Sequence, residues 1–487
     1  MKNKLIKLIS VLLMIPLAFS AVGCGQVVIP EYTSDKVIDI IAYSTPTNAN
    51  WDGHSTNPEG LTDKVFSDMA AAGFTGLQPL REGVGGNTLE QAHEKANADA
   101  LKAMDLCEKY GMHYMVRDWT FLGGFAINSS TGNHKQNWLN YFENGGTIDS
   151  GLEEMFALAS TQQVVNHVSY AGHHLWDEPT IQEMEQLVPV VRKYKQLVPN
   201  GDSFFNLLPC YASAAQLGIT IGQNYQDYVE YYCENIGNQL GYVCYDYYPY
   251  KDGTYTTSVD SMYLYNFELV AKLAKQYNLD FRMYIQANRA FGQSSRDVEG
   301  TYDLLQQMYC ALAYGCKYII YFVYGYGSND TDYVDTNLNP TQKYQYAKAA
   351  NEEIHKLEDV MFNFDWEKTI VMNRDPDRPN KGFEWVDDMY ATHDRITNWT
   401  VTRDTLAGCF KDAEGRDGFM FVNYEDPGKV LNRDGTPGED ISDTVSVTFK
   451  NAKKILVYEH GERKIVDGNT YNFVLGAGEG QFVIPLN

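Results

Sequence analysis

The chain has 487 residues and a formal net charge of −24. Binding of nucleic acid requires clustered Lys and Arg side chains, and no long basic run occurs here, so we expect no nucleic-acid partner. Tyr is abundant, at 36 residues. This abundance fits either a Tyr-rich composition alone or a surface that stacks on ring-shaped ligands.

Residues 1–24 resemble a bacterial lipoprotein signal peptide. Three Lys residues lie among the first seven positions, and the apolar stretch 8–19 is too short to predict a membrane-spanning helix. Small residues then precede Cys24. The resemblance implies that Cys24 is lipidated and holds the protein outside the cell on the bacterial membrane. Ordinary cleavage near Ala21, followed by free secretion, is the alternative.

Residues 25–37 are predicted to form a tether, and a repeated pattern follows over residues 38–363. Eight short apolar or aromatic runs alternate with amphipathic stretches. The runs begin at Asp39, Thr75, His113, Val168, Ser203, Gly241, Phe281 and Lys317. This spacing predicts a (β/α)8 TIM barrel. An open doubly wound sheet is the competing architecture, but no Gly-rich phosphate loop follows the first run.

Residues 364–487 have a different texture. Short alternating segments such as GFMFVNY, TVSVTF and KILVYEH are separated by turn signals such as DPDRPN and DGTPGED. This pattern predicts a C-terminal all-β domain, arranged like a sandwich.

The fourth run ends in HHLWDEPT, which places Asp177 and Glu178 side by side. In a barrel of this type the active site forms at the carboxyl ends of the strands. Helix capping does not account for the two acids, because Thr180 and Glu183 already form a capping box for the next helix. We therefore regard Asp177 and Glu178 as candidate functional residues.

The WDEP ending resembles the Asn-Glu-Pro ending of barrel glycoside hydrolases of the large retaining clan, including family 42 β-galactosidases. The later NEEIHKL segment resembles the last barrel helix of those enzymes. The resemblance implies that Glu178 is the general acid/base and that Asp177, in place of Asn, contacts the sugar's 2-hydroxyl. It also implies a carbohydrate substrate, and the signal-like N-terminus then indicates an oligo- or polysaccharide outside the cell. We expect no cofactor. A catalytically silent, glycan-binding barrel is the alternative.

The seventh run departs from that clan, which carries a nucleophilic Glu at the end of this strand. Strand alternation places Gln286 there instead, and an amide cannot form the usual glycosyl ester. Asp246, at the end of the sixth run, is the candidate second carboxylate, although a Tyr-bonded structural Asp would look the same. Strands four and six are two apart, which favours a wide separation and an inverting reaction with Asp246 as base.

Further side chains near the strand ends are candidates for binding a sugar through aromatic faces and hydrogen bonds. They are His174, Trp176, Arg117, Trp119, Tyr248, Tyr284, Gln286, Asn288 and Tyr324. Strand alternation places His174, Trp176 and Glu178 on one face. Because His173 and His174 point to opposite faces, we expect no metal site.

Overall fold

The computed structural model describes residues 27–45, 60–79, 88–118, 120, 135–252, 257–289, 295–325, 333–378, 380–386, 392–432 and 434–487. Cys24 and Trp119 lie outside these residues. The described part confirms the predicted (β/α)8 barrel followed by a C-terminal β domain.

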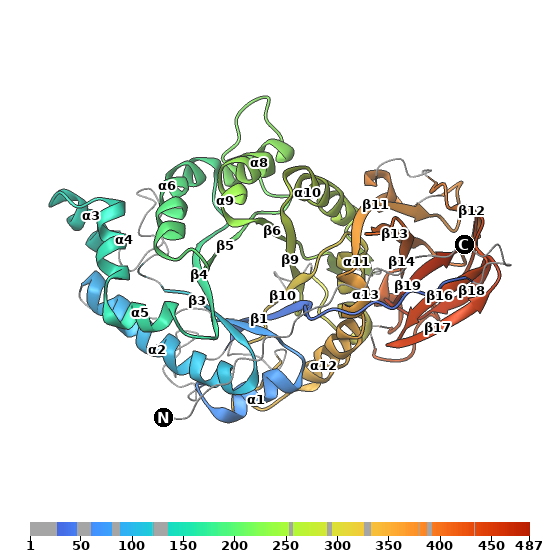
Figure 1. The fold of residues 1–487 in the computed structure, drawn as a ribbon, viewed down its shortest axis with the longest axis horizontal. Coiled ribbons are helices and arrows are strands. Elements are labelled where there is room, and N and C mark those ends of the chain that lie inside the picture. The colour runs from blue at the N-terminus through green and yellow to red at the C-terminus, as the bar shows by residue number, and fades with distance from the viewer. Residues whose placement is uncertain are drawn as a thin grey trace, which may run out of the picture.

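Eight parallel strands form the barrel. They are β1 (Asp39–Thr45), β2 (Gly76–Pro79), β3 (His113–Val116), β4 (Tyr170–Asp177), β5 (Asp202–Asn206), β6 (Tyr242–Asp246), β9 (Asp280–Gln286) and β10 (Tyr318–Phe322). Their order is β5-β4-β3-β2-β1-β10-β9-β6. Leu207, just beyond β5, closes the ring onto β6, because its N–H donates to the carbonyl oxygen of Cys244 at 2.9 Å. Figure 1 shows the strands within a surrounding layer of helices.

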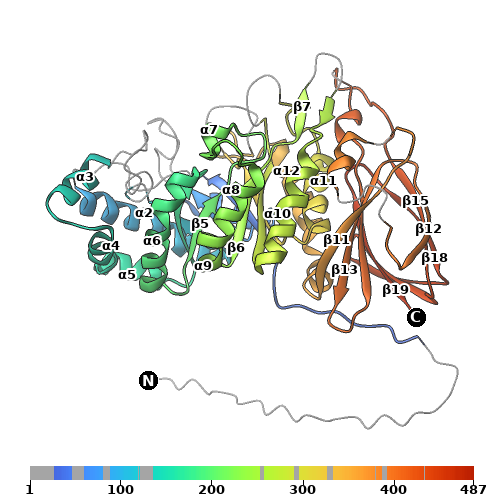
Figure 2. The same ribbon diagram turned by 90° about the horizontal axis from the view of Figure 1, so that it is seen from above.

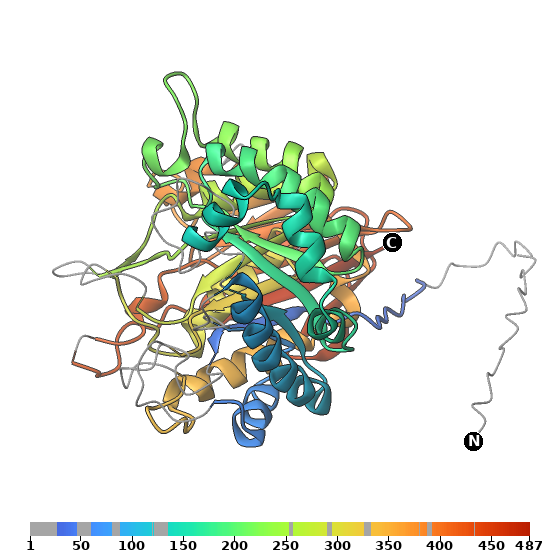
Figure 3. The ribbon, with the colours of Figure 1, turned by 90° about the vertical axis from the view of Figure 1, so that its left-hand side faces the viewer.

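The helices follow the strands in alternation. The longer ones are α1 (Asp63–Ala71), α2 (Leu89–Tyr110), α3 (Lys135–Glu143), α4 (Ile148–Phe156), α5 (Ala159–Val165), α6 (Ile181–Leu197), α8 (Tyr225–Tyr232), α10 (Tyr263–Tyr277), α11 (Thr301–Ala313) and α12 (Gln342–His355). Shorter elements are α7 (Ala214–Leu217), η1 (Cys233–Gly237), α9 (Asn238–Leu240), α13 (Glu358–Met361) and the hairpin β7 (Tyr250–Asp252) and β8 (Thr257–Val259). Three helices, α3 to α5, account for the long gap between the third and fourth runs. Figure 3 shows the barrel from the side away from the C-terminal domain.

Local sequence signals explain where several helices begin. The side chains of Thr62, Thr88 and Thr147 accept hydrogen bonds from backbone N–H groups in the first turns of α1, α2 and α4. Thr180 and Glu183 form the predicted capping box of α6. Asp177 and Glu178 therefore lie outside the helix start, as the sequence indicated.

Side chains alternate between the barrel interior and the layer beneath the helices. The interior cluster contains Ile41, Tyr43, Met115, Phe204, Tyr242, Cys244, Tyr248, Tyr284, Ile320 and Val323. Near the amino ends of the strands, Arg282 lies inside the barrel and forms an ion pair with Asp202. Its guanidinium stacks on the rings of Tyr242 and Tyr318, at 3.8 and 4.4 Å from their centroids. This arrangement fills that end of the barrel.

A β-bulge interrupts the alternation on β4. The register with β5 shifts between His174, which pairs with Phe204, and Trp176, which pairs with Phe205. His174 and Phe204 contact each other inside the barrel. Trp176 belongs instead to the core beneath the helices. The expectation that His174 and Trp176 share a face was therefore wrong, because the bulge adds one residue to the strand.

The C-terminal domain contains two packed antiparallel sheets. Its strands are β11 (Phe364–Met372), β12 (Ile396–Thr400), β13 (Thr405–Asp412), β14 (Asp417–Asn423), β15 (Asp443–Phe449), β16 (Lys454–Glu459), β17 (Glu462–Asp467), β18 (Thr470–Leu475) and β19 (Gly480–Leu486), with short η2 (Lys381–Trp385) and η3 (Pro427–Lys429) helices. The sheets have the orders β11-β13-β14-β19-β16-β17 and β12-β15-β18. Figure 2 shows the domain beside α10 and α11.

The barrel and the C-terminal domain pack closely against each other. A Cβ placed on Gly408 of β13 would lie 2.2 Å from the carbonyl oxygen of Ala313, at the end of α11. Only glycine allows the two backbones to approach this closely.

The segment before β1, predicted as a tether, lies against the molecule where it is described. The Tyr32 hydroxyl donates to Asp412 at 2.7 Å, and Arg463 donates to the carbonyl oxygen of Pro30 at 2.8 Å. Among the described residues, each helix is too short or too polar to cross a membrane.

Candidate active site

Three carboxyl groups gather at the carboxyl ends of two barrel strands. Asp177 ends β4, Glu178 follows it, and Asp246 ends β6. Glu178 has a φ of +49°, a conformation that few residues other than glycine adopt. Its N–H donates to the carbonyl oxygen of Asn206 at 2.9 Å. The bulge and this turn bring two neighbouring acids to the same rim.

Arg117 places a buried positive charge beside these acids. It follows β3 and is 7% exposed. Its Nη2 lies 3.2 Å from Oδ2 of Asp177, and its Nη1 donates to the hydroxyl of Tyr43. The guanidinium carbon lies 5.2 Å from the centroid of the Tyr43 ring. The ion pair fixes the orientation of Asp177.

The residue after Arg117 holds the end of β3 in place. Asp118 pairs with the buried ring of His93 and accepts the backbone N–H of Thr120 at 2.8 Å. The other ring nitrogen of His93 bonds to the hydroxyl of Thr161 at 2.7 Å. Asp118 is therefore a structural residue, and its partner is a histidine.

The acids change one another's proton affinity. Glu178 is exposed at the rim, yet partial loss of hydration, and then the charges of Asp246 and Asp177, raise its pKa to about 8. Asp246 is 3% exposed, and burial, followed by the charge of Asp177, raises its pKa to about 7. Hydrogen bonds from Tyr248 and Asn206 act on Asp246 in the opposite direction. Near neutral pH this site therefore holds a proton that a carboxylic acid in water would have lost.

Aromatic rings form the layer below the acids. Tyr248 packs on Phe322 with centroids 4.8 Å apart, and Tyr43 lies 5.3 Å from Tyr284. The interior cluster contains both Tyr248 and Tyr284, so these two predicted residues do lie on the barrel interior near the acids.

A polar chain crosses this layer. Gln78, at the end of β2, donates to Nδ1 of His174 and accepts from the hydroxyl of Tyr284 at 3.3 Å. Burial lowers the pKa of His174 well below its usual range, so the ring is neutral. The predicted His174 thus lies below the site and contributes to the position of Tyr284.

Gln286 ends β9, as predicted, but both its amide oxygen and its amide nitrogen are hydrogen-bonded within the protein. Its Oε1 accepts the backbone N–H of Tyr250 at 3.0 Å. Its Nε2 donates to the carbonyl oxygen of Arg296 at 2.6 Å and to the hydroxyl of Ser295 at 3.2 Å. Gln286 is 0% exposed. The expectation that it binds a sugar hydroxyl was wrong, because its donors and acceptor hold two loops together.

Two predicted aromatic residues do not reach the rim. Trp176 is 6% exposed and packs beneath the helices because of the β4 bulge. Tyr324 packs on Phe74 and Tyr333, with centroids 5.4 and 5.7 Å away. Val323 belongs to the interior cluster, so the next side chain points outward. We correct both expectations accordingly.

Asn288, another residue predicted to bind a sugar, lies just after β9. It is 7% exposed and donates to the carbonyl oxygen of Val323 at 3.3 Å, so it links the ends of β9 and β10. Trp119, also predicted at this rim, lies outside the described residues.

The sequence interpretation missed several residues of the site. Tyr43, Gln78 and Asn206 lie at or near the carboxyl ends of three barrel strands and contact the predicted residues directly. Tyr211, in the loop after β5, is 49% exposed, and partial loss of hydration, followed by the charges of Asp246 and Glu178, raises its pKa. The position of each residue just at or after a predicted strand was the signal that could have identified it.

Among the described residues, no group of three His, Cys, Asp or Glu side chains is arranged to hold a metal ion.

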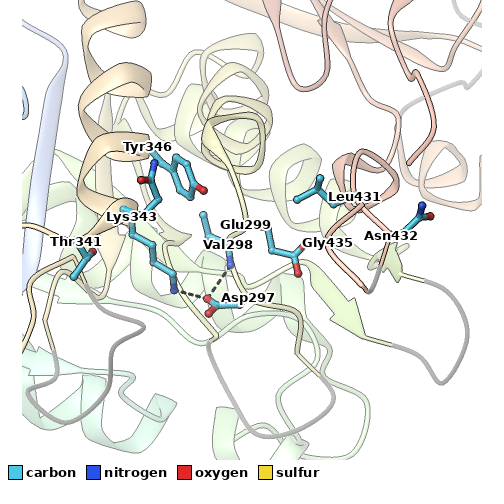
Figure 4. A pocket seen from close by; sticks show the side chains of 10 residues that line it. Asp297, Val298, Glu299, Thr341, Lys343, Tyr346, Leu431, Asn432 and Gly435 are labelled. Atoms are coloured by element: carbon cyan, nitrogen blue, oxygen red, sulfur yellow. Dashed lines mark hydrogen bonds and ion pairs between the residues drawn. The ribbon is translucent and has the colours of Figure 1, made fainter. Parts of the chain in front are cut away.

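A separate pocket of about 380 Å³ lies where the barrel meets the C-terminal domain (Figure 4). Its walls come from the segment 297–299 after β9, the first turn of α12 and the loop around Asn432. Lys343 pairs with Asp297 at 2.5 Å, and Asp297 also accepts the N–H of Val298 at 2.8 Å. The C-terminal domain therefore borders the carboxyl end of the barrel.

Comparison with known proteins gives a fold likeness. No family model and no curated protein matches the sequence. A catalytic mutant of a GH42 β-galactosidase from G. stearothermophilus superposes with a TM-score of 0.56 at 9% identity, over 94% of this chain and 99% of the other. The α-L-fucosidase isoenzyme 2 from Paenibacillus thiaminolyticus gives 0.56 at 9% identity, over 93% and 100%. Membership of family 42 stays a prediction.

Replacing Gln286 by Glu tests its structural role. The Gln286→Glu variant would set a carboxyl oxygen against the carbonyl oxygen of Arg296, so an acceptor replaces a donor. We expect a loss of ~1–3 kcal/mol or more in the free energy of unfolding. Urea unfolding measures the loss. Gln136→Glu makes the same change on the exposed surface of α3 and should be nearly neutral. Equal stability of the two variants would contradict the role.

Proposed function

We propose that this protein is a glycoside hydrolase that acts on an oligo- or polysaccharide outside the cell, with Glu178 as the general acid. One observation carries the proposal: Glu178 stands at the carboxyl end of β4, where loss of hydration, and then the charges of Asp246 and Asp177, raise its pKa. Hydrolysis of a glycosidic bond requires an acid that is still protonated at the working pH. The fold shared with two glycosidases is consistent with this activity but shows the fold alone.

The proposed reaction begins with proton transfer. Glu178 gives its proton to the glycosidic oxygen as the bond to the anomeric carbon breaks. Asp246 is the second carboxyl group of the site. Loss of hydration is the main reason why Glu178 keeps its proton, and the neighbouring acids add to it. Its assignment as the base of an inverting reaction stays a prediction.

Substrate binding would use the exposed ring and charges at the rim. Tyr211 is 49% exposed, and the Lys251 ammonium lies 5.6 Å from its ring centroid. A Tyr face can pack on the C–H face of a sugar ring. Arg117 and Asp177 would then supply a donor and an acceptor to sugar hydroxyls or amides.

The alternative is a barrel that binds glycans without cleaving them. It is supported by Gln286, whose amide is hydrogen-bonded within the protein. The usual nucleophile of the retaining clan has no counterpart at that position. Binding of an oligosaccharide without any release of reducing sugar would favour this alternative.

Loss of Glu178 tests the proposed function. We expect Glu178→Gln to lower kcat/KM by ~10²–10⁴-fold on substrates with poor leaving groups, because general acid catalysis contributes about that much. The assay measures release of sugar from a panel of aryl glycosides and oligosaccharides. Glu185→Gln makes the same change on the exposed face of α6 and should retain activity. Activity of Glu178→Gln within a few-fold of wild type would refute the role.

The raised pKa of Glu178 predicts how activity depends on pH. The acid must be protonated to act, so kcat should fall as pH rises through about 8. An ordinary glutamic acid would lose its proton near pH 4.3. A pH profile of kcat between 5 and 10 measures the position of this limb. A fall that is complete below pH 6 would show that the site does not hold the proton.

We also propose that Cys24 anchors the protein to the membrane through a lipid. This residue lies outside the described part of the chain, and the proposal rests on the signal-like sequence before it. Cys24→Ala should move the protein out of the membrane fraction or block its maturation, as measured by fractionation and immunoblotting. Cys210→Ala, which removes a half-buried free thiol, is the control. Unchanged membrane association of Cys24→Ala would contradict the anchor.

A further inference from the structure

Hydrolysis of a glycoside needs a group that attacks the anomeric carbon on the side opposite the leaving oxygen. The residue at the end of β9 cannot be this attacking group, because it is an amide, Gln286. That amide is also hydrogen-bonded to Tyr250, Ser295 and Arg296. The attacking or water-activating group must therefore be one of the acids at the ends of β4 and β6, or a group of the substrate itself.

Asp246 is poorly placed to activate a water. It is 3% exposed, and its carboxyl group also accepts hydrogen bonds from Tyr248 and Asn206. A base that activates water for inversion must leave room for that water between itself and the sugar. Burial and the neighbouring charge of Asp177 also favour the protonated form of Asp246.

Asp177 is better placed to contact a substrate. About a third of its side chain, 37%, is exposed, and one of its oxygens is held by Arg117 at 3.2 Å. It immediately precedes Glu178, so the proton donor and a second, oriented carboxylate come from adjacent residues. Asp246 is close enough for its charge to raise the pKa of Glu178, and its buried Oδ1 has no hydrogen-bond partner among the described residues. A polar group of a bound substrate would satisfy this atom.

A sugar that carries a 2-acetamido group brings its own nucleophile. The carbonyl oxygen of that group can reach the anomeric carbon when it lies trans to the leaving oxygen, as in a β-linked 2-acetamido-2-deoxy-glucoside or -galactoside. A carboxylate that binds the amide N–H orients the group and offsets the positive charge that develops on it.

Resting on the proposed function, we infer that the substrates are β-linked 2-acetamido-2-deoxy-hexosides, and that Asp177 holds the acetamido N–H while its carbonyl oxygen displaces the leaving group. This assigns Asp177 a catalytic role in place of the contact to a 2-hydroxyl.

The reaction balances in two steps. In the first, the acetamido oxygen bonds to the anomeric carbon, the glycosidic C–O bond breaks, and the leaving oxygen takes the proton of Glu178. The result is a cyclic oxazolinium whose N–H is held by Asp177. In the second step, water adds to the anomeric carbon, gives a proton back to Glu178, and the ring C–O bond breaks to restore the acetamide. The product keeps the β configuration.

The aromatic layer suits the rest of that group. The acetamido methyl is apolar, and the rings of Tyr43, Tyr248, Tyr284 and Phe322 lie beneath the acids. Of these rings Phe322 is the one that is partly exposed, so it is the ring that an acetamido methyl would contact.

The first experiment compares aryl β-glycosides of 2-acetamido-2-deoxy-glucose and -galactose with the matching 2-hydroxy sugars. We expect cleavage of the acetamido sugars, a β product by proton NMR, and a stepwise fall in kcat as fluorine atoms are added to the acetyl methyl. A thiazoline analogue of the cyclic intermediate should bind at least ~10²-fold more tightly than the substrate.

The second experiment removes the negative charge of Asp177. Asp177→Asn should lower kcat on the acetamido substrate by roughly 10²–10³-fold. Asp202→Asn is the matched control, because Asp202 also pairs with an arginine inside the barrel, Arg282, but at the opposite end. It should retain kcat even if its melting temperature falls.

The outcomes separate this inference from the proposed function. Cleavage of 2-hydroxy sugars alone, or an inverted product, would overturn the inference and leave a glycoside hydrolase in place; inversion would favour Asp246 as the base. Full activity of Asp177→Asn would overturn it as well. Failure to cleave any glycoside would refute the proposed function together with the inference.

Discussion

The ion pair between Arg117 and Asp177 is the constraint on which the site depends. Three carboxyl groups share one end of the barrel, and mutual repulsion would separate them or neutralise them all. A buried guanidinium, held by Tyr43 and pointed at Asp177, offsets part of that charge. The ion pair holds Asp177 at the rim, beside two acids whose pKa values burial raises. Arg117 in turn depends on the fixed end of β3, where Asp118 pairs with His93.

Much of the architecture could be predicted, because it repeats. Apolar runs at near-constant spacing identify a barrel without knowledge of any contact, and Tyr284, a predicted residue of the site, does lie inside it. The same rule failed on β4, where one extra residue turned Trp176 outward. A bulge of this kind depends on the fit between neighbouring strands, so the pattern of a single strand does not reveal it.

Prediction of the site was limited by contacts between distant residues. The sequence shows that Gln286 is an amide and therefore no nucleophile, but it does not reveal that this side chain holds two loops together. The amide oxygen binds the backbone of Tyr250, 36 positions earlier, and the amide nitrogen binds Arg296, 10 positions later. Tyr211 was missed for a related reason: it belongs to a loop, and only the closed barrel brings it to Asp246 and Glu178.

The packing of the N-terminal segment has a geometric consequence. Residues 30–32 contact the C-terminal domain, and the chain then enters β1 at the amino ends of the barrel strands. Glu178 lies at the other end of those strands. A surface that held the chain by its N-terminus would therefore meet the closed end first, with the acids directed outward. In that orientation a long polymer could approach the rim from the surrounding medium without passing between the protein and its support.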